Sequence, residues 1–79
     1  MEIRMKGTYV QDITVEGKPA IQVNDSKSRL KAYCTTEDCI FFGEGKVNPG
    51  DTVEVRAEVE DACGKILIGR LKTIFKTNR

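Results

Sequence analysis

Basic, amide and aromatic side chains alternate with apolar ones in two short segments, 20–24 and 28–34. In the second segment Arg29, Lys31 and Tyr33 share one parity, so as strand residues they would project from the same face. Gln22 and Asn24 hold the polar parity of the first segment. Lysine and arginine neutralise phosphates, amides bond bases or sugars, and a tyrosine ring can stack on one base for about 1–3 kcal/mol. This chemistry suits a nucleic-acid strand; the competing interpretation is an ordinary solvated strand face.

The three cysteines, Cys34, Cys39 and Cys63, raise the question of a metal site. Four residues separate the first two, a wider spacing than in most zinc sites, and histidine is absent. A fourth ligand would have to be Asp38, Asp61, a residue of a neighbouring molecule or water. Cys34 falls on the apolar parity of its segment, where a thiol behaves as a small hydrophobe. We therefore expect Cys34 to be buried and no metal to be bound; a Cys34–Cys39 disulfide would require an oxidising compartment.

Catalytic residues are scarce. The sequence has no histidine and no glycine-rich phosphate loop. Glu58, Glu60 and Asp61 lie in an acidic run that is typical of a strand edge kept in water. We expect neither an enzyme nor a cofactor nor a small-molecule substrate.

The composition is that of one small domain covering residues 1–79, with a net charge of +1. The longest apolar run, Cys39 to Phe42, is far shorter than the roughly 20 residues of a membrane span. No apolar signal-peptide segment follows Met1, and the number of cysteines is odd, so we expect a reduced, cytoplasmic protein. Charge is segregated: residues 44–62 hold six acidic and two basic residues, and residues 64–79 hold five basic and no acidic ones.

The strongest structural pattern is the segment from Val47 to Glu60. Its Asn-Pro-Gly-Asp turn has suitable residues for a tight bend, and Asp51 can bond its neighbouring backbone. Four apolar residues then alternate with charged ones, which predicts a half-buried antiparallel strand; they are Val53, Val55, Ala57 and Val59.

Similar patterns predict four more strands, over 3–15, 20–24, 28–34 and 65–75. Gly7 and the broken alternation at Val10 predict a bulge or sharp coil in the first of them. Leu30 is expected to point inward with the apolar residues of the third. Thr35 or Thr36 can cap a short helix between Thr35 and Glu44, which Gly43 or Gly45 can stop; a further strand is the alternative.

The order of strand, strand, strand, short helix, strand, strand resembles the OB-fold, a five-stranded Greek-key barrel. The sequence is similar to OB domains of the replication protein A family and to anticodon-binding domains of aminoacyl-tRNA synthetases. The similarity lies in Gly7 of the first strand, Asp25 after the second, and Gly50-Asp51 before the fourth. An SH3-like barrel is the alternative all-β architecture.

The resemblance implies a binding surface on the outer faces of strands two and three and on the flanking loops. In this chain the surface would consist of Lys18, Gln22, Asn24, Arg29, Lys31, Tyr33 and Lys65. It also implies that the helix closes one barrel end, which would bury Phe41 or Phe42. Phe75 is expected in the core, or else exposed toward a partner.

Two functional hypotheses follow. In the first, a standalone OB-fold module binds single-stranded DNA or RNA, chiefly through phosphate contacts and one stacking tyrosine. In the second, the same barrel is an interaction module or accessory subunit that binds a protein. The basic residues and the tyrosine favour the first hypothesis. The small net charge and the few aromatic residues favour the second.

Overall fold

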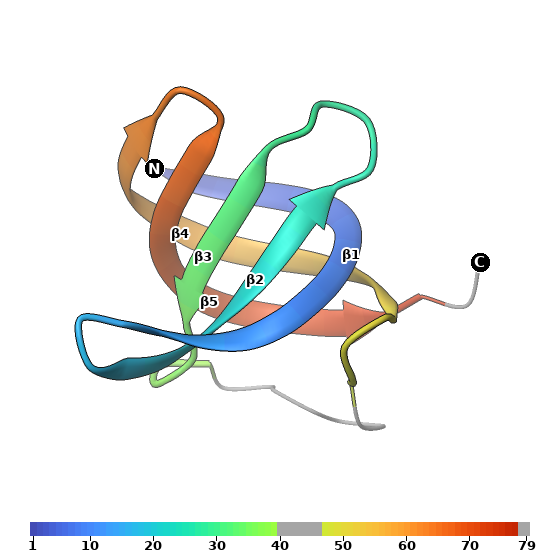
Figure 1. The fold of residues 1–79 in the computed structure, drawn as a ribbon, viewed down its shortest axis with the longest axis horizontal. Coiled ribbons are helices and arrows are strands. Elements are labelled where there is room, and N and C mark those ends of the chain that lie inside the picture. The colour runs from blue at the N-terminus through green and yellow to red at the C-terminus, as the bar shows by residue number, and fades with distance from the viewer. Residues whose placement is uncertain (40–46, 78–79) are drawn as a thin grey trace.

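The structure is a computed structural model that describes residues 1–39 and 47–77. It is an all-β chain with the five predicted strands (Figure 1). Their bounds are Glu2–Val15 for β1, Lys18–Asp25 for β2, Lys31–Thr35 for β3, Thr52–Cys63 for β4 and Ile66–Lys76 for β5. The described residues include no helix that is long and apolar enough to cross a membrane.

The strands close into a barrel in the order β1-β2-β3-β5-β4. The first half of β1 pairs with β4 and its second half with β2, both antiparallel. β3 and β5 run parallel, and β5 returns antiparallel along β4. Because β1 pairs with both β4 and β2, its bend joins the two halves of the barrel.

Gly7 lies at this bend and pairs with both Asp25 of β2 and Val53 of β4. A Cβ built on Gly7 would lie 1.9 Å from the backbone oxygen of Asn24. Only glycine therefore allows β2 to approach β1 this closely. The predicted irregularity near Val10 is confirmed as a register shift between Tyr9 and Gln11.

The Asn48–Asp51 turn is attached to β1 rather than free in solvent. The Asp51 carboxylate accepts a bond from the Asn48 amide at 2.8 Å, as its turn chemistry predicts. Tyr9 donates its backbone N–H to the Asp51 carbonyl at 3.0 Å and accepts from the Gly50 amide at 2.8 Å. This clamp positions the start of β4 against the barrel.

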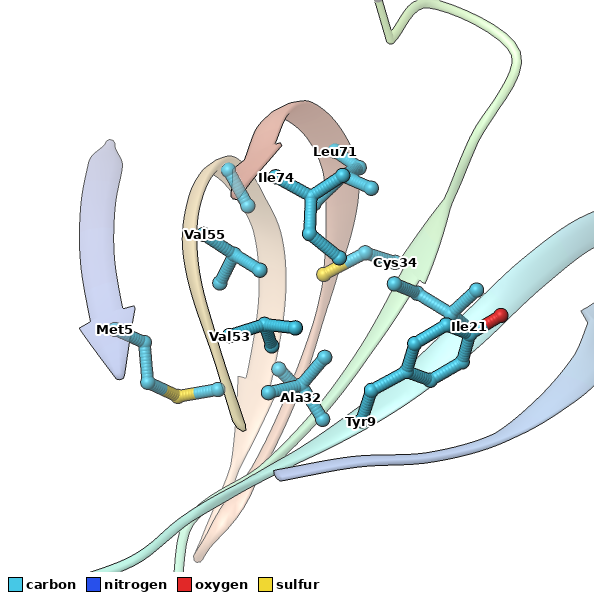
Figure 2. Close-up of a cluster of buried hydrophobic side chains, with 11 residues drawn as sticks. Met5, Tyr9, Ile21, Ala32, Cys34, Val53, Val55, Leu71 and Ile74 are labelled. Atoms are coloured by element: carbon cyan, nitrogen blue, oxygen red, sulfur yellow. The ribbon is translucent and has the colours of Figure 1, made fainter. Parts of the chain in front are cut away.

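The core fills the barrel with apolar side chains from all five strands (Figure 2). Alternation in β4 is confirmed for Val53, Val55 and Ala57, which are all buried. It fails at Val59, which is only half-buried, because the β4–β5 register shifts between Val59 and Asp61. The other buried members of the cluster are Met5, Tyr9, Ile21, Val23, Ala32, Cys34, Leu71 and Ile74.

Two predictions about local structure need correction. β3 begins at Lys31 rather than Ser28, because Arg29 adopts a left-handed φ of 65° that no strand accommodates. Leu30 therefore precedes the strand and is half-buried outside the core cluster. Of the two alternatives for Phe75, core or exposed, the structure shows the second, since the residue is 47% exposed on β5.

The predicted helix lies partly outside the described residues. Within them no helix is present, and residues 36–39 instead form a turn in which the Cys39 amide donates to the Thr36 carbonyl at 3.2 Å. The rest of the predicted helix, with Phe41 and Phe42, falls in residues 40–46, which are not described.

Candidate functional site

The outer sides of β2, β3 and β5 form one continuous surface, called here the outer face. Ala32 and Cys34 point into the core, so the alternating residues of β3 point outward. In the two ladders Tyr33 lies between Gln22 of β2 and Ile68 of β5. The outer face consists of Gln22, Asn24, Lys31, Tyr33, Thr35, Ile66, Ile68 and Arg70.

Gln22 lies on the outer face as predicted, but it is not available as a surface amide. Only 7% of the residue is exposed, because it is flanked by Tyr33 on β3 and by Gln11 on β1. Its carbonyl accepts from the Gln11 amide at 2.9 Å, and its own amide donates to Asn24 Oδ1 at 2.9 Å. The more accessible ends of this amide network are therefore Gln11, which is exposed, and Asn24, which is half-buried.

Four cations gather at one end of the outer face, called here the basic end: Lys27, Arg29, Lys31 and Lys65. The β2–β3 loop and the β4–β5 turn meet there, at the top of Figure 1. The Lys31 amide donates to the Lys65 carbonyl at 2.8 Å, and Lys65 Nζ donates to the Ser28 carbonyl at 3.0 Å. Sequence reasoning included three of these cations. It missed Lys27, although the cluster of three basic residues in 27–31 was visible.

The conformation of the β2–β3 loop is held by Asp25. Its Oδ1 accepts from the backbone amides of Lys27 at 2.7 Å and Ser28 at 3.2 Å. The bond from Lys27 is the main reason why the pKa of the Asp25 carboxyl lies below its usual value. Ionised Asp25 thus organises the loop that carries Lys27 and Arg29.

Replacing Asp25 by alanine is expected to lower the free energy of unfolding by about 1–2 kcal/mol, since two loop amides lose their acceptor. The depressed pKa means that this stabilisation is complete above the unfolded value of 3.8 and disappears as pH falls through the folded-state value. Urea unfolding of wild type and Asp25→Ala at pH 7 and near pH 3 measures both effects. A difference in stability that persists undiminished at the lower pH would contradict the role of the ionised carboxylate.

Apolar side chains lie around Tyr33 on the outer face. The tyrosine itself is half-buried, Ile68 beside it is half-buried, and Ile66 beside Lys31 is 39% exposed. A last strand was predicted over 65–75, but neither Ile66 nor Ile68 was assigned to the site from the sequence. The missing information was the parallel pairing of β3 with β5, which no local pattern encodes.

Lys18 lies at the other end of the outer face, apart from the basic end. It begins β2 and pairs with Val15, and its Nζ is 3.8 Å from Glu37 Oε1. Beside it is a cleft of about 320 Å³, called here the acidic cleft. The cleft is lined by Val15, Glu16, Lys18, Thr35, Glu37, Asp38, Glu60, Asp61, Ile68, Gly69 and Arg70.

The cysteines occupy three different environments. Cys34 is buried, as predicted, and desolvation raises the pKa of its thiol to about 11. Cys39 packs against the core cluster from the turn after β3, and Cys63 is exposed at the end of β4. Within the described parts of the chain, no three cysteine or carboxylate side chains come together as metal ligands.

Sequence comparison gives no relative from which to transfer a function. No protein-family model and no curated protein sequence matches the chain.

Proposed function

We propose that this protein is a small OB-fold module that binds single-stranded DNA or RNA across its outer face. The strand order β1-β2-β3-β5-β4, with β3 and β5 parallel, supports the OB-fold assignment. The observation that carries the functional proposal is the basic end lying directly beside Tyr33. The three basic residues in 27–31 and Lys65 come from separate segments, and the fold brings them together.

Phosphates and bases would be bound at different positions along β3. The cations of the basic end hold the phosphates and release counterions, which supplies affinity without sequence preference. Tyr33, with Ile68 beside it, offers an apolar surface on which a base can stack. Gln11 and Asn24 can bond base edges or sugars at the border of this surface. No step of this function requires catalysis or a cofactor.

A protein-binding role is the second candidate, and one observation favours it. Phe75 is 47% exposed on the far side of the barrel. It lines a hollow of about 200 Å³ together with Arg4, Glu54, Arg56 and Thr73. An exposed aromatic ring between charged side chains is a typical anchor for a protein partner. Binding there would leave the outer face unused.

The salt dependence of binding tests the first proposal. Fluorescence anisotropy with a labelled oligothymidylate measures affinity at several salt concentrations. In the double variant Arg29→Ala/Lys31→Ala the slope of log K against log salt is expected to flatten by up to about 1.4, because each phosphate contact contributes about 0.7. The matched control is Arg4→Ala/Lys6→Ala, which removes the same charge from the exposed side of β1 where it pairs with β4.

Equal slopes for wild type and Arg29→Ala/Lys31→Ala would place the binding site elsewhere. Tyr33→Ala is expected to weaken binding about 5- to 150-fold while leaving the slope unchanged, since stacking is worth about 1–3 kcal/mol and releases no counterions. Absence of binding to any single strand at low salt would make the protein-partner role the better candidate.

A further inference from the structure

The acidic cleft borders the surface proposed to receive the base. Ile68 lines the cleft and is also the parallel neighbour of Tyr33, and Thr35 lines it two residues further along β3. The cleft carries five carboxylates: Glu16, Glu37, Asp38, Glu60 and Asp61. Its two cations are Lys18 and Arg70, so two positive and five negative groups give it a formal charge of −3. The charge of the outer face therefore reverses within the length of β3.

Both cations of the acidic cleft are engaged by carboxylates. Arg70 Nε lies 2.8 Å from Glu60 Oε2, and its Nη1 donates to Asp38 Oδ2 at 3.3 Å. The Lys18 ammonium faces Glu37 at 3.8 Å. At the basic end, by contrast, no lysine or arginine forms an ion pair with a carboxylate of the described residues. Arg70 thus lies on the outer face, but two carboxylates occupy its guanidinium group.

We propose that the acidic cleft ends the nucleic-acid path, and that Asp38 and Glu60 keep Arg70 from extending it. This inference rests on the proposed function and specifies its site length. A phosphate that continued past Tyr33 toward Thr35 would meet uncompensated carboxylates, and like charges repel most where a cleft focuses the field. Only the stretch around Lys31 and Tyr33 then favours the strand.

The geometry implies a short footprint. Even the whole of β3, from Lys31 to Thr35, is only roughly 13 Å long at about 3.3 Å per residue, and the favourable stretch is shorter. OB domains occupy roughly 4–16 nucleotides of single strand. This barrel is expected at the low end of that range, with about four nucleotides in contact.

An oligothymidylate length series tests the inference. Affinities for dT4, dT8 and dT12 are measured for wild type, for Asp38→Asn/Glu60→Gln and for the control Glu2→Gln/Glu54→Gln. The control is closely matched: it also removes two carboxylates and also releases an arginine, because Glu2 Oε2 lies 2.7 Å from Arg56 Nη2 on the far side of the barrel. Loss of exposed ion pairs changes stability little, so all three proteins should fold.

The expected result is a length-dependent gain for one variant only. The ratio of variant to wild-type affinity cancels the larger number of binding registers on longer strands. For Asp38→Asn/Glu60→Gln this ratio should stay near 1 with dT4 and rise to about 10 with dT12, with a salt slope steeper by about 0.7 as Arg70 gains a phosphate. For the control the ratio should not depend on length.

Other outcomes separate this inference from the function on which it rests. Equal ratios at every length, or the same rise for the control, would show a general charge effect and overturn the boundary. Glu16→Gln/Asp61→Asn removes two cleft carboxylates that pair with neither Arg70 nor Lys18, and it should raise dT12 binding without steepening the slope. The same steepening in that variant would overturn the role of Arg70. Absence of wild-type binding to any oligothymidylate would remove the proposed function itself.

Discussion

Replacing Gly7 by alanine is expected to lower the free energy of unfolding by about 3 kcal/mol, the upper end of typical overpacking costs. The added Cβ would lie 1.9 Å from the Asn24 carbonyl oxygen and 3.0 Å from Asp25 Cα. Both contacts are with backbone, so no side chain can move aside. Relief requires β1 and β2 to separate where β1 also pairs with β4. For a domain of this size the loss corresponds to a decrease in Tm of roughly 15 °C, measurable by circular dichroism.

Gly17→Ala is the matched control for this prediction. Gly17 has a left-handed φ of 79°, but a Cβ there meets nothing within 4 Å. Its replacement tests backbone strain alone, which costs about 1–2 kcal/mol. If Gly7→Ala destabilises no more than Gly17→Ala, the close approach of β2 is not what requires the glycine.

The strands were predictable because burial on one face imposes a period of two. Val53, Val55 and Ala57 face the core as their spacing predicts, and the same holds for Ile21 and Val23. The prediction of burial failed at Val59, where a bulge interrupts the period of two. Whether Val59 stays in the core depends on the register of β4 with β5, and a register between segments is not encoded in either one alone.

The site was harder to predict than the scaffold. The predicted outward direction holds for Lys31 and Tyr33, but not for Arg29, whose left-handed φ places it in a loop. Gln22 points outward and is still buried, because neighbouring side chains cover it. The direction of a side chain follows from its position in the alternating strand pattern, whereas its exposure depends on the side chains of the adjacent strands.

Contacts between distant segments did not follow from local patterns, and only the resemblance to OB domains placed Lys65 and Lys18 on the predicted surface. Lys65 joins the basic end because the β4–β5 turn folds onto the β2–β3 loop, and Lys18 falls among carboxylates for a similar reason. Strand pairing in space decides both placements. The reversal of charge along β3 follows from the topology, and the linear segregation of charge in the sequence does not show it.

Leu71→Ala is expected to lower the free energy of unfolding by about 2–5 kcal/mol, through lost burial and the cavity that remains. Leu71 is fully buried in the core cluster, on β5 opposite Ala57 (Figure 2). The neighbouring Lys72→Ala is the control, since an exposed substitution changes stability by no more than about 0.5 kcal/mol. Urea unfolding measures both variants, and a Leu71→Ala loss as small as that of Lys72→Ala would contradict the assigned packing.

Leu71→Ala also tests whether binding at the outer face depends on the packing of the core. Leu71 points inward, whereas Ile68 and Arg70 on the same strand point outward. Leu71→Met keeps the side-chain volume and should lower the free energy of unfolding by less than about 1.5 kcal/mol. It therefore keeps the barrel stable and leaves the residues of the outer face unchanged. Under conditions where Leu71→Ala is fully folded, its affinity for a single strand should equal that of wild type. Weakened binding by the folded variant would mean that the outer face depends on core packing for its shape.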